Sequence, residues 1–208
     1  MIVVHHLNDS RSQRILWLLE ELALPYQIER YERDAQTRLA PPELKAVHPL
    51  GKSPVITDDG RVINESGAII DYLIRRHGRG RLQPSPETPA YDDYVQWLHY
   101  AEGSAMLPLL LNLYASRLGD AKASLMPRID SEIANHLGYV DGALKGRQYL
   151  LGDAFTGVDI QMSFVGEVAG AFGKRAAYPN IDAWVKRLHE RPAYKAALER
   201  GGPYGLGR

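Results

Sequence analysis

The chain has 208 residues, of which 45% are hydrophobic, so it can bury one large core or two small ones. Its 25 Lys and Arg residues equal its 25 Asp and Glu residues, and this balance argues against binding to the nucleic-acid backbone. The absence of cysteine excludes disulfides, thiolate metal sites and a cysteine nucleophile, and it is typical of a reducing compartment.

No stretch of the sequence has the pattern of a targeting or membrane segment. The first residues, MIVVHHLNDS, become polar too soon for a secretory signal peptide. The longest apolar runs, such as 106–111, fall far short of the length that spans a bilayer. We therefore expect a cytoplasmic protein that has neither nucleic acid nor a membrane as a partner.

The beginning of the chain alternates between strand and helix signals. The β-branched run Ile2-Val3-Val4 indicates a strand, and apolar residues recur at helical spacing after Ser10. The segment YQIERY at 26–31 alternates apolar and polar residues, as a half-buried strand does. A βαβ unit of this kind brings its two strands together in parallel.

Two more strand signals follow, Val55-Ile56 and Val62-Ile63, and Asp58-Asp59-Gly60 between them predicts a hairpin turn. Residues 69–73 then indicate one face of a helix that ends near His77-Gly78. The order βαβ followed by ββα predicts a thioredoxin-like α/β domain. Because the chain lacks a Cys-x-x-C motif, we do not expect dithiol chemistry from it.

The run RGRLQPSPETP at 79–89 predicts a linker, which we place over residues 81–89. We expect the thioredoxin-like domain over residues 1–80 and an all-helical domain over residues 90–208, because strand signals disappear beyond the linker. Helices are expected in the second domain at 90–118 with a kink at Pro108, at 124–145, at 157–172, after Pro179 and after Pro192.

The stretch SPVITDDGRVINESG at 53–67 begins with a feature of a ligand site. A proline at the start of a strand is tolerated on a sheet edge, where no ladder hydrogen bond is lost. The thioredoxin-like order predicts that the Ser53–Pro54 bond is cis. Such a turn would present the main chain of Val55 to an extended ligand.

The same stretch ends with Glu65 and Ser66 at the N-terminus of the next predicted helix. Free N–H groups and the positive end of the helix dipole attract a carboxylate there. Ser66 can hydrogen-bond that carboxylate and Glu65 can face an ammonium group, so the pair suits an α-amino acid head group. The alternative is that Ser66 is an N-cap and Glu65 is a first-turn acid.

Ser10 also has two interpretations. Ser10-Arg11-Ser12-Gln13 fits the S-x-x-Q capping box, in which the serine hydroxyl bonds to the N–H of Gln13. Ser10 also lies where the first strand meets the first helix, at the carboxyl end of a parallel pair, where α/β proteins place ligands. A hydroxyl there can stabilise a bound thiolate and lower the pKa of its thiol below about 8.5.

Two other motifs are not expected to take part in catalysis. His99 and Glu102 have a metal-like spacing on a helix but no third ligand, so we expect no metal. Thr156-Gly157-Val158-Asp159 fits a T-x-x-D capping box, with Phe155 and Ile160 as its hydrophobic staple. We expect Thr156 and Asp159 to be structural and to start a buried helix.

Taken in order, these segments resemble a cytosolic glutathione transferase of the serine-type fungal and bacterial branch. SRSQRILWLLEEL, HPLGKSPVI and INESGAIIDYL are similar to the glutathione-binding half of that family. YAEGSAMLPLL, TGVDIQMSF and YPNIDAWVKRLHERPAY are similar to its helical half. The likeness covers nearly the whole chain in the family's order and spacing.

The resemblance implies that glutathione is the co-substrate. In the family, the proline that matches Pro54 is cis, and the residue that matches Val55 pairs with the cysteinyl backbone. The pair that matches Glu65 and Ser66 binds the γ-glutamyl end, and Lys52 would meet the glycine carboxylate.

The resemblance also implies which residues lie near the thiol. Ser10 matches the thiol-activating serine of serine-type members. Other relatives use an asparagine or a main-chain N–H, so Asn8 is the second candidate, and we favour Ser10. Arg11 would help at the thiol end or contact the second substrate.

A second substrate is expected between the domains, against the helix at 90–118. Tyr100, Met106, Leu107 and Leu110 are the candidates for its site, because an apolar wall that contains methionine suits hydrophobic electrophiles. Ordinary core packing is the alternative for each of them. The family pairs as two-fold dimers, which implies a homodimer.

The function implied is detoxification by transfer of the glutathione thiolate to a hydrophobic electrophile, with catalysis from thiol activation and proximity. Glutathione-dependent reduction of peroxides or disulfides and isomerisation are alternatives on the same fold. A non-catalytic ligandin that binds glutathione without turnover is the alternative from another class.

Overall fold

The computed structural model describes residues 1–207, which form two compact units. The first unit contains residues 1–83 and 188–207, and the second contains residues 84–187. The change between them at residue 84 falls inside the expected linker. Residues 188–207 belong to the α/β unit, whereas the sequence placed them in the helical domain.

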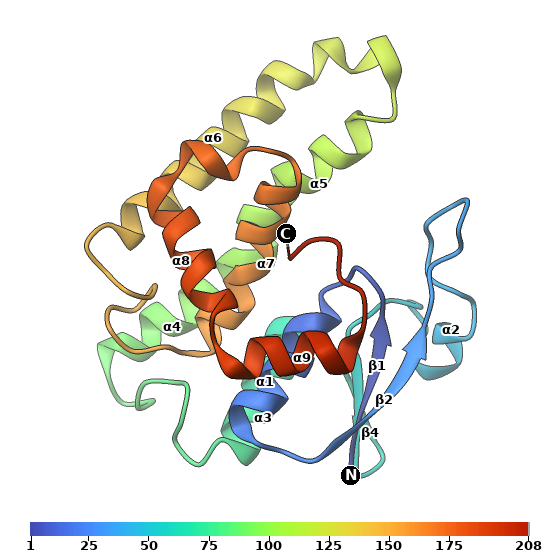
Figure 1. Cartoon of the computed structure of the whole chain (residues 1–208), viewed down its shortest axis with the longest axis vertical. Coiled ribbons are helices and arrows are strands. Elements are labelled where there is room, and N and C mark those ends of the chain that lie inside the picture. The colour runs from blue at the N-terminus through green and yellow to red at the C-terminus, as the bar shows by residue number, and fades with distance from the viewer. Residues whose placement is uncertain (208) are drawn as a thin grey trace. The chain divides into compact units, whose positions relative to one another are not determined.

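The first unit is built on a four-stranded sheet of order β2-β1-β3-β4 (Figure 1). β1 (Ile2–Leu7) pairs in parallel with β2 (Tyr26–Tyr31), as the βαβ pattern predicted, and antiparallel with β3 (Val55–Asp58). β3 pairs antiparallel with β4 (Arg61–Asn64) across Asp59-Gly60. Both turn residues have positive φ, 47° and 81°, which a two-residue hairpin requires. The expected fold class is confirmed.

Pro54 stands before an inner strand, because β3 lies between β1 and β4. The expectation that this proline marks a sheet edge was therefore wrong. Pro54 is tolerated because the ladder begins one residue later, at Val55, so no ladder hydrogen bond is lost. The Ser53–Pro54 bond is cis, as predicted.

Helices α1 (Ser12–Leu22) and α3 (Ser66–His77) pack against each other and against the sheet. These two helices contribute fully buried side chains to the core: Ile15, Leu16, Leu18, Leu19, Ile69, Ile70 and Leu73. Asp58 of β3 accepts a hydrogen bond from the Tyr72 hydroxyl at 3.0 Å and anchors the sheet to α3. A short helix, α2 (Leu44–Val47), precedes the hairpin.

Helix α9 (Pro192–Gly201) lies alongside α1 (Figure 1). Arg191 forms a two-point ion pair with Glu21, with Nε–Oε1 and Nη2–Oε2 distances of 2.6 and 3.0 Å. Trp17 and Tyr194 pack edge to face, with ring centroids 5.1 Å apart. These contacts explain why the end of the chain belongs to the first unit, since helical periodicity alone cannot show which core a helix joins.

The second unit consists mainly of helices, and α8 ends in the first unit. The helices are α4 (Pro89–Tyr100), α5 (Met106–Ala115), α6 (Met126–Leu144), α7 (Gly157–Ala171) and α8 (Pro179–His189), with short 3₁₀ segments at Gly119–Ser124 and Arg175–Ala177. A π-helical turn, Ala101–Ala105, separates α4 from α5. Pro108 has no N–H to donate to the preceding turn, so the disturbance expected at the proline lies just before it.

The capping box at the start of α7 is confirmed. Asp159 Oδ2 accepts from Thr156 N at 3.0 Å, and Oδ1 accepts from Leu150 N and from Trp184 Nε1, each at 3.0 Å. Burial nevertheless raises the pKa of Asp159 to about 6, because it disfavours the charged carboxylate more than these hydrogen bonds favour it.

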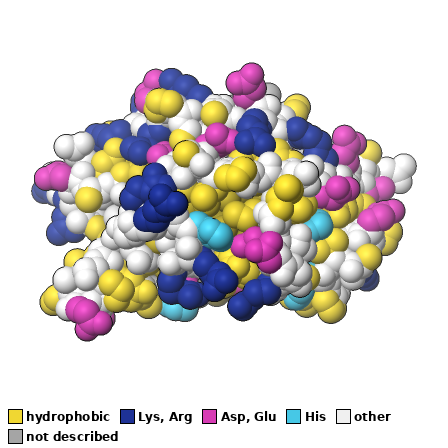
Figure 2. All heavy atoms as spheres, turned by 90° about the horizontal axis from the view of Figure 1, so that it is seen from below, with side chains coloured by type: hydrophobic (Ala, Val, Ile, Leu, Met, Phe, Trp, Pro, Cys, Tyr) yellow, Lys and Arg dark blue, Asp and Glu magenta, His cyan; other side chains and the backbone are white. Residues whose placement is uncertain are grey.

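Charged side chains of both signs lie on the face shown in Figure 2, separated by apolar and uncharged surface. Across residues 1–207, no helix is both long enough and apolar enough to cross a bilayer. The same residues contain no group of three or more His, Asp or Glu arranged to hold a metal ion.

Gly201→Ala should destabilise the protein. A Cβ at Gly201 would lie 2.5 Å from Gln13 Oε1 and 3.0 Å from Leu16 Cδ1, and both side chains are buried in α1. We expect the free energy of unfolding to fall by about 1–3 kcal/mol, which is typical of overpacking. Denaturant titration measures this loss.

Gly138→Ala is the matched control, because a Cβ on this residue of α6 meets nothing within 4 Å. Ala is a better helix former than Gly, so this change should stabilise the protein by roughly 0.5–1 kcal/mol. Equal effects of the two substitutions would contradict close packing of α9 on α1.

The raised pKa of Asp159 predicts a loss of stability with rising pH. Asp159 binds its proton more tightly in the folded than in the unfolded chain, so its contribution is complete below the unfolded pKa of 3.8 and is lost as the pH rises through about 6. Asp159→Asn removes this titration. The advantage of the native chain over Asp159→Asn should therefore be larger at about pH 5 than at about pH 7, by about 1 kcal/mol of unfolding free energy. An equal advantage at the two pH values would contradict the raised pKa.

Candidate functional site

The strand register brings the predicted site segments to one end of the sheet. His5 of β1 pairs with Val55 of β3, and Val55 pairs with Asn64 of β4. The carboxyl ends of β1 and β4 and the start of β3 therefore lie at the same end of the sheet. Because Ser10 follows β1 and Ser66 follows β4, the two serines lie at that end.

A buried hydrogen bond connects the N-terminal turns of α1 and α3. Arg14 Nη2 donates to Ser66 Oγ at 2.6 Å, and both residues are only 3% exposed. The guanidinium thus adds its charge to the positive end of the α3 dipole. Arg14 was not predicted as a site residue. Its position one helical turn after Ser10 could have indicated that its side chain lies near the same site.

Ser66 is the first residue of α3, and Glu65 is the N-cap. No side chain caps this helix terminus, so the alternative interpretation of Ser66 as an N-cap was wrong. Its hydroxyl accepts from Arg14 instead. Glu65 is exposed and has a φ of 64°, which is uncommon for a residue with a Cβ. Strained residues of this kind often cluster at ligand sites.

The Ser10 hydroxyl is buried, and its hydrogen bonds are with Ser12. Ser10 Oγ lies 2.8 Å from Ser12 Oγ and accepts from Ser12 N at 3.2 Å. Gln13 N bonds to the main-chain oxygen of Ser10, the N-cap of α1 is Arg11, and the Gln13 amide has no hydrogen-bond partner among residues 1–207. The expected capping box is therefore absent, because Ser12 takes up the Ser10 hydroxyl in place of the Gln13 N–H.

Ser12 in turn contacts His6 of β1. Ser12 Oγ lies 2.8 Å from His6 Nδ1 and accepts from Leu7 N at 3.2 Å. Burial and the nearby Arg30 lower the pKa of His6 to about 4, although a hydrogen bond to the main chain of Gly201 acts in the opposite direction. His6 is therefore neutral at neutral pH.

Asn8 is bonded to the loop that follows β2. Its Oδ1 accepts from Arg33 N at 2.9 Å, and its main-chain oxygen accepts from Arg33 Nε at 3.1 Å. Asn8 therefore holds this loop in place.

The remaining residues expected on the glutathione side differ in exposure. The Val55 side chain is buried at the start of β3, so a contact of this residue with a ligand would have to come from its main chain. Lys52 is exposed in the loop before Pro54, and Arg11 is half-buried at the N-cap of α1.

The four residues expected at the electrophile site do not form one surface of the second unit. Met106 is 1% exposed and belongs to the core, whereas Leu107 is 54% exposed and Leu110 is half-buried. The Tyr100 hydroxyl lies 2.7 Å from His136 Nδ1 of α6.

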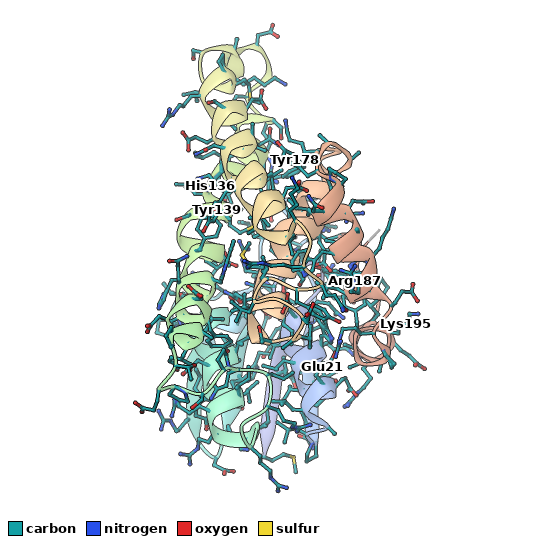
Figure 3. The ribbon with its side chains drawn as sticks, turned by 90° about the vertical axis from the view of Figure 1, so that its left-hand side faces the viewer. Glu21, His136, Tyr139, Tyr178, Arg187 and Lys195 are labelled. Atoms are coloured by element: carbon teal, nitrogen blue, oxygen red, sulfur yellow. The ribbon has the colours of Figure 1, made fainter. Side chains whose placement is uncertain are left out.

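Tyr100 belongs to an aromatic cluster between α4 and α6. Its ring packs edge to face with Trp97 and with Tyr139, each at a centroid distance of 5.3 Å. Figure 3 shows His136 and Tyr139 close together on α6. Burial raises the pKa of Tyr100 to about 12, so the hydroxyl stays protonated while it forms its hydrogen bond with His136.

Comparison with known families gives two matches. Residues 10–76 match the model of the glutathione S-transferase N-terminal domain, and residues 103–192 match that of the C-terminal domain. Glutathione S-transferase 3 of Schizosaccharomyces pombe is 36% identical over 96% of this chain and 88% of its own length.

Solved structures agree over the whole chain. A glutathione S-transferase from Actinobacillus pleuropneumoniae is 37% identical, with a TM-score of 0.92 over 100% of this chain and 96% of the other. A glutathione transferase family member from Pseudomonas fluorescens with two glutathione bound is 28% identical, with a TM-score of 0.80 over 95% of this chain and 92% of the other.

Proposed function

Because this chain belongs to the glutathione S-transferase family, we propose that its first unit binds glutathione at the end of the sheet where Ser10 and Ser66 lie. The thiol would lie beside Ser10 and the γ-glutamyl end at Ser66. The chain is a glutathione transferase enzyme. Glutathione bound to the relative from Pseudomonas fluorescens supports the choice of ligand. The observation that supports the site most strongly is the register, which puts the loops of Ser10, Pro54 and Ser66 at one end of the sheet.

The γ-glutamyl end of glutathione has an α-carboxylate and an ammonium group. The carboxylate would meet the Ser66 hydroxyl and the N–H groups at the start of α3, next to the Arg14 guanidinium. Glu65 is exposed beside them and would face the ammonium group. Val55 would pair with the cysteinyl backbone, and Lys52 would meet the glycine carboxylate.

Ser10 is the preferred partner of the sulfur. Asn8 is bonded to the Arg33 loop, whereas among residues 1–207 the Ser10 hydroxyl bonds only to Ser12, at the junction of β1 and α1. A hydroxyl that donates to the sulfur stabilises the thiolate and lowers the thiol pKa. The thiolate then attacks an electrophile that is held beside it. Arg11 would contribute positive charge at this end.

We propose that a hydrophobic electrophile binds against α5. Leu107 and Leu110 present apolar surface on α5, which supports a hydrophobic electrophile, and Tyr100 would contribute its ring.

Large apolar side chains on α5 and after it are exposed, which supports a homodimer that covers them: Leu111, Tyr114, Leu118 and Leu125. The absence of cysteine supports a cytoplasmic location.

Ser10→Ala should raise the thiol pKa of bound glutathione and leave its Kd nearly unchanged. A hydrogen bond to a charged group contributes about 1.5–3 kcal/mol, so we expect a rise of roughly one to two pKa units. The ultraviolet absorbance of the thiolate, followed against pH, measures the pKa, and calorimetry measures the Kd. Asn8→Ala is the comparison. A rise in Asn8→Ala with none in Ser10→Ala would transfer the role to Asn8.

Arg14→Met should weaken glutathione binding without changing the thiol pKa. The change removes the hydrogen bond to Ser66 and the positive charge behind the carboxylate site, so we expect the Kd to rise by about tenfold or more. Arg75→Met is the matched control, because Arg75 lies in the last turn of α3 and pairs with Asp71 at the surface. A folded Arg14→Met protein with the Kd of the native chain would rule out this role.

A further inference from the structure

A chain of hydrogen bonds leads from the Ser10 hydroxyl into the interior of the first unit. Ser10 Oγ lies 2.8 Å from Ser12 Oγ, and Ser12 Oγ lies 2.8 Å from His6 Nδ1. The His6 ring also bonds to the main chain of Gly201, the last residue of α9. Ser10, Ser12 and His6 are 4%, 0% and 4% exposed, so bulk water does not compete for these groups.

The direction of each hydrogen bond follows from His6. Nδ1 faces Ser12, so a hydrogen bond from the ring to the Gly201 main chain would come from Nε2. Because a carbonyl oxygen only accepts, we infer that Nε2 carries the proton. A neutral imidazole has one N–H, so Nδ1 is an acceptor and Ser12 donates to it. Ser12 has a single hydroxyl hydrogen, so it can only accept from Ser10. The Ser10 hydrogen therefore points toward Ser12.

Two main-chain groups complete this arrangement. Leu7 N donates to Ser12 Oγ at 3.2 Å, and Ser12 N donates to Ser10 Oγ at 3.2 Å. The hydrogen and both lone pairs of Ser12 Oγ are then in use. Ser10 Oγ has one lone pair left, so it offers an acceptor rather than a donor to a ligand.

We propose that His6 and Ser12 are positioning residues that hold the Ser10 hydrogen away from the glutathione sulfur until the thiol ionises. The S–H group of glutathione first donates to the remaining lone pair of Ser10. When the thiol proton leaves to solvent water, the Ser10 hydroxyl turns its hydrogen from Ser12 to the negative sulfur. This inference rests on the proposed function, because it concerns the sulfur of glutathione bound beside Ser10.

His6 does not serve as the final acceptor of the thiol proton. Its burial and the charge of Arg30 on β2 keep its pKa near 4, below that of an ordinary activated thiol. A proton passed through Ser10 and Ser12 would therefore not remain on the ring. His6 is a fixed acceptor that sets the direction of the chain.

His6→Phe tests this role, because it removes the acceptor and keeps a ring of similar size. The Gly201 oxygen retains its hydrogen bond from Arg30 Nη1 at 2.7 Å. Ser12 can then donate to Ser10, since its other acceptor, Leu7 O, is farther away at 3.3 Å. Ser10 would direct its hydrogen outward without giving up a bond, so the thiol pKa of bound glutathione should fall by about half to one unit with little change in Kd.

The same substitution in a Ser10→Ala background is the control, and there the thiol pKa should not shift. If His6→Phe leaves the thiol pKa unchanged, raises it, or shifts it equally in both backgrounds, the inference is overturned while the proposed function stands. If calorimetry detects no glutathione binding to the native chain, the proposed function fails and the inference fails with it.

A second measurement needs neither glutathione nor a variant. Nitrogen NMR of the native chain reports which His6 nitrogen is protonated at neutral pH. We expect the proton on Nε2, with Nδ1 unprotonated. A proton on Nδ1 would reverse the chain and overturn the inference, whether or not His6→Phe folds.

Discussion

The pairing of His5 with Val55, and of Val55 with Asn64, determines where every candidate group of the first unit lies. It places the end of β1, the start of β3 and the end of β4 at one end of the sheet, so the loops after β1 and β4 and the loop before β3 converge there. A shift of one residue in this register would turn each strand's side chains to the opposite face and separate Ser10 from Ser66. The site is therefore a consequence of sheet pairing, and the chemistry of its side chains acts within that frame.

The C-terminal segment packs against α1 and contacts residues near the same end of the sheet. Gly201 lets α9 approach α1 closely, its main-chain oxygen accepts from Arg30, and its main chain acts to raise the pKa of His6. Because His6 faces Ser12, and Ser12 faces Ser10, the packing of α9 is connected to the hydroxyl proposed to meet the sulfur. Residues at the far end of the chain thus contribute both to the stability of the first unit and to the geometry of its site.

Local sequence patterns predicted much of this architecture. The alternation in YQIERY, the Asp-Gly turn and the capping box of Thr156 and Asp159 each depend on residues within a few positions of one another, and the structure has all three. The features that the sequence missed depend on distant partners. Arg14 meets Ser66 52 positions away, and α9 joins α1 rather than the helical unit. The capping-box alternative for Ser10 was wrong because Ser12 takes the Ser10 hydroxyl and itself contacts His6.

The central claim is that one end of the sheet binds glutathione by its γ-glutamyl group and places the sulfur beside Ser10. A crystal structure of the native chain with glutathione tests this claim most directly. The account predicts the γ-glutamyl carboxylate at the N-terminus of α3 beside Ser66, and the sulfur within hydrogen-bonding distance of Ser10 Oγ. Glutathione bound elsewhere, or a sulfur that contacts Asn8 and not Ser10, would contradict it.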